Sequence, residues 1–155
     1  RVRIIREGER TGIGTVIFFE LGSDKLSDDG KAVLDAEVAQ LAGKPQKIEI
    51  RGHTTQQLAA QGMGPEKAME LAYRRCLDVM QYLIEEHQIP PERIRLACAG
   101  ASEPMYLSGD SEKQRQNPRV EVFLLNETVE QLIGTVQERD SQILQDEVET
   151  LNQLK

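Results

Sequence analysis

Short strand-like segments, separated by two long helical patterns and by glycine- or proline-rich breaks, most strongly constrain the fold of this chain. Residues 15–19 are β-branched and aromatic, which is typical of a buried strand. Gly8, Gly12 and Gly14 predict a turn-rich stretch before that strand. The other segments of strand character are residues 1–6, 47–51, 94–99 and 119–125.

The two helical patterns lie between these strands. Ser27 is a favourable N-cap, and the acidic residues that follow it complement the helix dipole in a helix that ends near Gly43. Pro65 suits the first turn of a second helix, which continues to about Gln88. The resulting order, β-β-α-β-α-β-β, predicts an α/β (α+β) sandwich with two helices packed on a mixed sheet.

Residues 126–155 have a different pattern and predict a long amphipathic helix after a domain at residues 1–125. Its apolar positions form two stripes, offset across Arg139 and Asp140, so the heptad phase is interrupted. Such a helix could fold back on the domain, or it could form a coiled coil or dock a partner protein. Its length and narrow apolar stripes favour the second alternative. The helix would then be an arm that serves self-association or binds a protein partner.

Charge and hydropathy exclude several classes of function. A net charge of −7 and a pI near 5.0 argue against a nucleic-acid-binding protein. No apolar run approaches the ~18–20 residues that a membrane-spanning helix needs. The chain begins at Arg1, so we expect it to be a fragment that a signal peptide, lipid anchor or membrane helix could precede.

No combination of residues indicates an enzyme or a cofactor site. Phosphate-binding loops, nucleophile elbows and paired acids are missing from the sequence, and His53 has no second metal ligand near it. We therefore expect no catalysis, no cofactor and no metal. Cys76 and Cys98 lie in apolar contexts, which favours buried free thiols over a mutual disulfide.

Several short motifs occur in order along the chain and resemble the OmpA-like domain family, whose C-terminal domains associate with peptidoglycan. They are residues 19–26, 48–54, 71–76 and 117–122, together with Gly100 and Pro104. The resemblance covers about residues 2–125. It implies the OmpA-like β-α-β-α-β sandwich and a place in the periplasm or cell envelope, in association with the outer membrane.

The resemblance also implies a ligand site. In the family, the residue after Gly52, His53 and Thr54 is an aspartate that meets the ammonium group of diaminopimelate, and a helical arginine, here Arg75, meets its carboxylate. A guanidinium suits that carboxylate because it can donate two parallel hydrogen bonds. The alternative role for Arg75 is a surface ion pair with Asp78, three residues further along the helix.

Two positions depart from the family pattern. Thr55 replaces the aspartate, and Ala68 lies where the family shows an asparagine; the loop between them is also longer than usual. An ammonium group without a counter-charge costs on the order of 1–3 kcal/mol, which weakens binding roughly tenfold to a hundredfold. Glu66 or Glu70 could supply a carboxylate, although acidic residues commonly occupy the start of a helix.

Three functions follow as hypotheses. The first is a peptidoglycan-binding module with weakened or altered recognition of diaminopimelate, using Gly52, His53, Thr54, Thr55 and Arg75; the sixth candidate site residue is Arg119, in the closing motif. The second is a degenerate domain that serves protein–protein assembly without binding peptidoglycan. The third is a binder of another small carboxylate at Arg75.

Overall fold

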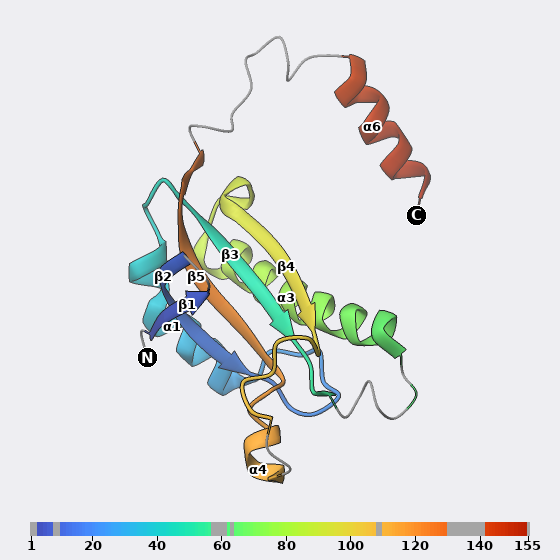
Figure 1. Cartoon of the computed structure of the whole chain (residues 1–155). Helices are drawn as coiled ribbons and strands as arrows, with labels where there is room; N and C mark the ends of the chain where they lie inside the picture. Colours follow the sequence, from blue (N-terminus) through green and yellow to red (C-terminus); the bar gives the residue numbers. More distant parts are fainter. Residues whose placement is uncertain are drawn as a thin grey trace.

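The computed structural model describes residues 3–7, 10–56, 62, 64–107, 110–129 and 142–154 (Figure 1). Its strands are β1 (Arg3–Glu7), β2 (Arg10–Phe18), β3 (Gln46–His53), β4 (Ile94–Gly100) and β5 (Arg119–Thr128). Its helices are α1 (Asp28–Leu41), α3 (Gly64–His87), the short 3₁₀ turn η2 (Pro91–Arg93), α4 (Ser111–Gln114) and α6 (Gln142–Gln153).

The five described strands form one mixed sheet in the order β1-β2-β5-β3-β4. β1 with β2, β2 with β5 and β3 with β5 are antiparallel pairs, whereas β3 and β4 are parallel. A parallel pair needs a long crossover, which α3 supplies, and α1 and α3 both pack on one face of the sheet (Figure 1). The predicted α/β sandwich is therefore confirmed.

The core lies between the helices and this face. Alternate residues of β3 and β5 point into the core, and the residues between them face the other side of the sheet. α3 contributes an apolar stripe at helical spacing. The fully buried members of this core include Ile48, Ile50, Val120, Val122, Val79 and Leu83.

β2 is longer than the sequence predicts, because the expected turn-rich stretch belongs partly to the strand. Gly12 and Gly14 pair with Ile5 and Arg3 of β1. On the other side, Gly14 lies opposite Phe123, and a Cβ on Gly14 would come within 2.5 Å of the Phe123 Cβ. The glycine thus makes room for a neighbouring aromatic side chain instead of ending the strand.

The C-terminal boundary also differs from the prediction. β5 continues past residue 125, since Thr128 pairs with Gln46 and the Val129 N–H donates to the Pro45 carbonyl over 3.0 Å. Of the predicted long helix the structure describes α6, and residues 130–141, with the offset at Arg139 and Asp140, lie outside the described part. The division into domain and arm stays a prediction.

Local signals at the helix ends explain the positions of α1 and α3. Ser27 caps α1 as predicted, its Oγ accepting a hydrogen bond from the Gly30 N–H over 3.0 Å. α3 begins one residue before Pro65, which the sequence predicts in its first turn, and ends beside Gln88, whose φ of 53° is left-handed. Within the described residues, no helix is long and apolar enough to cross a membrane.

The two cysteines differ in exposure. Cys76 of α3 is fully buried, as expected. Cys98 is exposed, which corrects the expectation that both thiols are buried. The reason is topological, because β4 is the edge strand of the sheet.

Candidate functional site

The candidate site is built where β3 ends against α3, and Gly52 permits this close contact. A Cβ on Gly52 would lie 2.3 Å from the Ala72 carbonyl oxygen and 2.7 Å from the Cys76 Sγ. Both distances are shorter than any tolerable contact. A residue without a side chain is therefore required at the start of the Gly-His-Thr turn.

The turn is held on its other side by β4. The Thr54 N–H donates to the Gly100 carbonyl over 2.7 Å, directly after a register shift between Gly52 and His53. Thr54 and Thr55 are each only 1% exposed. The Thr54 hydroxyl has no hydrogen-bond partner among the described residues, so this buried polar group remains available to a ligand or to water.

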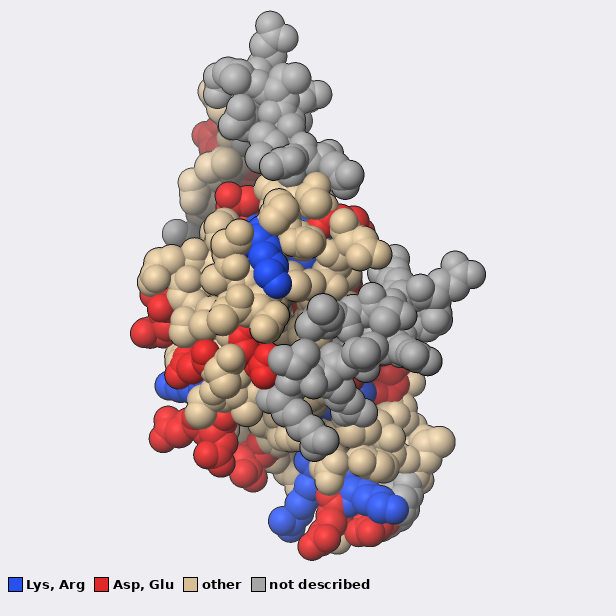
Figure 2. Space-filling model, turned by 90° about the vertical axis from the view of Figure 1, so that its left-hand side faces the viewer, with Lys and Arg blue, Asp and Glu red and all other residues tan. Residues whose placement is uncertain are grey.

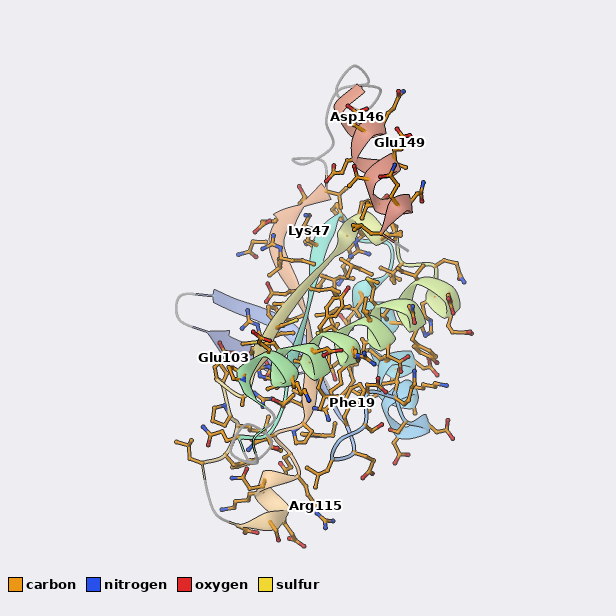
Figure 3. The ribbon with its side chains drawn as sticks, turned by 90° about the vertical axis from the view of Figure 1, so that its right-hand side faces the viewer. Phe19, Lys47, Glu103, Arg115, Asp146 and Glu149 are labelled. Carbon is orange, nitrogen blue, oxygen red and sulfur yellow. The ribbon has the colours of Figure 1, made fainter. Side chains whose placement is uncertain are left out.

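Arg75 is the central cation of the site, and it is fully buried. Its Nε donates to the Ser23 carbonyl over 2.8 Å, and its two terminal nitrogens donate to the carbonyls of His53 at 2.9 Å and Glu20 at 3.3 Å. The guanidinium also lies 5.5 Å from the centre of the Phe19 ring. Phe19 is labelled beside α3 in Figure 3. Arg75 thus joins the loop after β2 to the end of β3.

Burial lowers the pKa of Arg75 to about 10, although the charge of Asp24 opposes this shift. The guanidinium therefore stays charged at neutral pH. Three of its five N–H groups donate to the carbonyls described above, and the other two are what Arg75 can offer a ligand carboxylate.

The alternative role predicted for Arg75, a surface ion pair with Asp78, is wrong. Arg75 is buried, and Asp78 instead accepts a hydrogen bond from the Leu26 N–H over 2.6 Å. The Glu20 and Ser23 carbonyls are partners that sequence reasoning missed. Any residue carries a backbone carbonyl, so no residue type could have signalled these contacts.

His53 and Arg119 lie on the other face of the sheet. They are a register pair between β3 and β5. Arg119 Nε donates to the Glu121 carboxylate over 2.8 Å and its terminal nitrogens donate to the carbonyls of Asn117 and Glu103. His53 Nε2 lies 3.6 Å from the same Glu121 carboxylate.

Opposing influences set the pKa of Glu121. Burial alone raises it, but the contacts with His53 and Arg119 lower it to about 2. Arg119 and Glu121 alternate along β5 with the core residues Val120 and Val122. Arg119 and Glu121 therefore face away from α3. Their contacts with His53 hold the end of β3 on the face of the sheet opposite the helices.

The structure also places Ala68 and the two acidic residues, Glu66 and Glu70, that could replace the family's aspartate. Ala68 is buried in the first part of α3, at 4% exposure. Glu70 is exposed and accepts a hydrogen bond from Arg74 over 2.7 Å, which balances its charge. Glu66 is also exposed. Neither carboxylate is shown in contact with Thr55.

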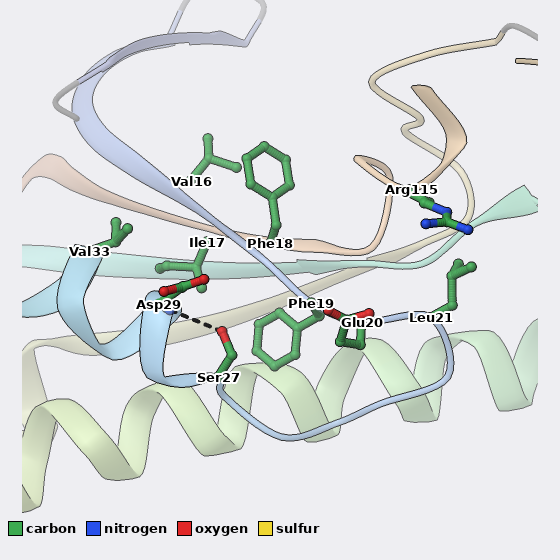
Figure 4. A pocket seen from close by; sticks show the side chains of 11 residues that line it. Val16, Ile17, Phe18, Phe19, Glu20, Leu21, Ser27, Asp29, Val33 and Arg115 are labelled. Carbon is green, nitrogen blue, oxygen red and sulfur yellow. Dashed lines mark hydrogen bonds between the residues drawn. The ribbon is translucent and has the colours of Figure 1, made fainter. Parts of the chain in front are cut away.

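Two hollows lie near the site. One of about 490 Å³ lies between β2 and α1 (Figure 4). There Val16 and Phe18 point to one side of the strand and Ile17 and Phe19 to the other. A second of about 470 Å³ lies beside Arg74, between α3 and the loop after β2. The six predicted site residues are not among the described residues that line either hollow.

Surface charge and potential metal ligands add two observations. Acidic and basic side chains are interspersed on the face shown in Figure 2, with no extended basic patch among the residues coloured there. In the part of the chain that the structure describes, His, Cys, Asp and Glu side chains form no group of three that could hold a metal ion.

Comparison with known proteins identifies the family to which this fold belongs. The model of the OmpA family matches residues 18–118. The chain belongs to this family, as its motifs predict.

Individual relatives agree with this assignment. The peptidoglycan-associated lipoprotein of Pseudomonas aeruginosa is 29% identical over 108 residues, which cover 70% of this chain and 61% of the relative. The chain thus spans about three-fifths of the length of that curated relative.

Solved structures show the same fold. The peptidoglycan-associated lipoprotein from Burkholderia pseudomallei superposes with a TM-score of 0.63 at 21% identity, covering 71% of this chain and 89% of that one. The C-terminal domain of Helicobacter pylori MotB gives 0.60 at 25% identity, covering 73% and 85%. The periplasmic domain of the same MotB gives 0.63 at 19% identity, covering 99% and 91%. These relatives belong to the periplasm and cell envelope, which confirms the expected location of this chain.

Proposed function

We propose that this chain is a non-catalytic module of the cell envelope that contacts peptidoglycan, with weakened or altered recognition of the diaminopimelate-type stem peptide. The observation that carries this proposal is the hydrogen bond of 2.9 Å from Arg75 to the His53 carbonyl. It couples the family's arginine to its Gly-His-Thr turn. Relatives named for association with peptidoglycan support the same assignment.

Arg75 and Thr54, which this chain shares with the family pattern, suit the carboxylate end of diaminopimelate. Arg75 keeps its positive charge and two N–H donors, and the Thr54 hydroxyl is an additional donor or acceptor. A bidentate contact would need the Arg75 carbonyl partners to shift, because the side chain is buried in the present arrangement. The proposed module therefore opens the loop around Ser23 when it binds.

The side chains that would bind the ammonium end of diaminopimelate are missing. Thr55 is buried and neutral, and Ala68 has no polar side-chain atom. A hydroxyl can accept a hydrogen bond from an ammonium group but cannot balance its charge. We expect affinity for diaminopimelate that is weaker by roughly tenfold or more than that of a domain with the aspartate.

An alternative function is protein–protein assembly without peptidoglycan binding. The apolar residues Val148, Leu151 and Leu154 at the C-terminal end of the chain are 58%, 60% and 76% exposed. Such an unpartnered apolar stripe is typical of a helix that packs against another chain. The engagement of three Arg75 N–H groups with backbone carbonyls favours this alternative as well.

A titration with a diaminopimelate-containing muropeptide, followed by amide chemical shifts at His53, Thr54 and Arg75, separates these functions. Saturable shifts at these positions are expected from the proposed module. Unchanged shifts at millimolar muropeptide would contradict it and favour assembly.

Pimelate is the matched control ligand, because it carries the two carboxylates of diaminopimelate without the ammonium groups. Shifts of similar size with pimelate and diaminopimelate are expected if Thr55 leaves the ammonium unrecognised. A response to diaminopimelate alone would show that another carboxylate, such as Glu66 or Glu70, has replaced the aspartate.

A further inference from the structure

The two cysteines of the chain meet above Gly52. In the parallel pair of β3 and β4, Gly52 is the register partner of Cys98. Two and four residues earlier, Ile50 pairs with Leu96 and Ile48 with Ile94, so Cys98 points to the same face, toward α3. Gly52 has no side chain to separate Cys98 from the helix above it.

Cys76 fills this space from the helix. Its Sγ would lie 2.7 Å from a Cβ at Gly52. It also lies 3.5 Å from the Ile50 carbonyl oxygen and 3.6 Å from that of Ala97, the residue before Cys98. Each of the two thiols is close enough to influence the pKa of the other. The thiols are therefore adjacent, although 22 positions separate them in sequence.

The two thiols differ in their accessibility to an oxidant. Cys98 is exposed on the edge strand, whereas Cys76 is 0% exposed behind it. Burial, together with contacts from Cys98 and Glu49, raises the pKa of the Cys76 thiol to about 12. An oxidant can therefore reach Cys98 first, with Cys76 held in position as the second thiol.

We propose that Cys76 and Cys98 form a disulfide that ties α3 to β4 when the chain is in the periplasm. That compartment is oxidising, and these are the only two cysteines of the sequence. The oxidant is a disulfide carried by another molecule, such as a thiol oxidoreductase or oxidised glutathione.

The reaction is a pair of thiol–disulfide exchanges. The Cys98 thiolate attacks the oxidant's disulfide and forms a mixed disulfide, releasing one thiol of the oxidant. The Cys76 sulfur, after losing its proton, then attacks Sγ of Cys98 and releases the second thiol. The two cysteines together lose two electrons and two protons, and the oxidant's disulfide is reduced to two thiols.

The link would reinforce the candidate site directly. Cys76 follows Arg75, and Cys98 lies two residues before Gly100, whose carbonyl holds the Thr54 N–H. The disulfide would thus join the strand that supports the turn to the helix that carries the arginine. The expected effect on the oxidised chain is a melting temperature higher by roughly 5–10 °C.

Peptide mapping tests this proposal. The chain is exported to the periplasm, its free thiols are blocked with N-ethylmaleimide in denaturant, and it is digested with trypsin without a reductant. The expected product is residues 76–93 joined to residues 96–113, lighter than the sum of the two thiol peptides by two hydrogen atoms. The same product is expected when the reduced chain is incubated with oxidised glutathione.

Blocked thiols at both positions, a glutathione adduct on Cys98 alone, or dimers joined through Cys98 would each overturn the proposal. Cys98→Ser is the main control, because the exposed site tolerates the change without loss of fold. This variant must show no cross-linked peptide, and its melting temperature must not respond to oxidised glutathione. A similar rise in melting temperature in Cys98→Ser would also overturn the proposal.

Discussion

At the scale of single residues, Arg75 organises the site through backbone carbonyls. Its three hydrogen bonds reach the loop after β2 and the end of β3, which are more than twenty residues away in sequence. A planar guanidinium can hold three carbonyls in different directions, whereas an ammonium group on a flexible stem holds them less well. The same residue thus stabilises the fold and is the cation that we propose for a ligand carboxylate.

Replacing Arg75 with lysine tests this double role. We expect Arg75→Lys to lower the free energy of unfolding by ~1–3 kcal/mol, because a buried carbonyl loses its donor. Urea denaturation measures the change. The neighbouring Arg74→Lys is the matched control, since Arg74 is exposed and pairs only with surface carboxylates; it should change stability by less than about 0.5 kcal/mol. Equal effects of the two substitutions would contradict the account of Arg75.

Gly52 allows a second prediction at this scale. We expect Gly52→Ala to cost ~1–3 kcal/mol or more, because its Cβ would collide with the Ala72 carbonyl and push α3 from the sheet. Gly43→Ala is the comparison, with a φ of +69° but open space around the new Cβ, and should cost ~1 kcal/mol from backbone strain alone. Thermal denaturation that ranks Gly43→Ala as the more damaging change would contradict the packing argument.

At the scale of elements, α6 is described without any buried side chain among residues 145–154. A helix of 12 residues is marginally stable in water unless its apolar side packs against something. Val148 and Leu151 are spaced three residues apart and lie on one side of the helix. Self-association is the simplest way for α6 to bury this side.

Truncation tests this role of α6. Deletion of residues 130–155 removes α6 but keeps Thr128 and Val129, whose pairing completes β5. We expect the full chain to show a larger mass in solution than one protomer, and the truncated chain to be monomeric, by light scattering. Val148→Glu with Leu151→Glu should have the same effect as the deletion. A full chain that is already monomeric would count against self-association.

At the scale of the whole molecule, buried charges on the sheet face opposite the helices link stability to pH. Glu121 has a pKa of about 2 in the folded chain, below the ordinary value of 4.5. A lowered pKa in the folded state means that the carboxylate stabilises the fold above pH ~4.5. This contribution is lost as the pH falls from about 4.5 toward 2.

Glu121→Gln should therefore be less stable than the original chain at pH 7 by about 3 kcal/mol. The difference should shrink steadily below pH 4.5 and nearly vanish at pH 2. Urea denaturation across this range measures it. A difference that stays constant with pH would show that packing, and not the charge of Glu121, is responsible.

Much of the fold could be predicted from sequence, because strand and helix patterns are local. Residues 15–19 and the cap at Ser27 are examples. The start of β2 could not be predicted, because Gly14 is a strand residue through its pairing with Arg3 and Phe123, which no local pattern records. The exposure of Cys98 depends on the order of strands in the sheet, which no local pattern records.

The candidate site divides in the same way. The sequence correctly predicts that Gly52, His53 and Thr54 lie at the end of a strand, beside the helix that carries Arg75. The burial of Arg75 and its carbonyl partners cannot be predicted from residue types, because every residue carries the same backbone acceptor. The binding roles of these residues remain predictions.

The affinity of the chain for a diaminopimelate-containing muropeptide, before and after restoring the carboxylate at position 55, tests the central claim most directly. Isothermal titration should show Thr55→Asp binding roughly tenfold or more tightly than the original chain, because the ammonium group regains a counter-charge. Thr55→Asn has nearly the same shape without the charge and should bind no better than Thr55. Equal affinities for all three, or an equal gain with asparagine, would contradict the view that the missing charge at position 55 is what weakens peptidoglycan binding by this domain.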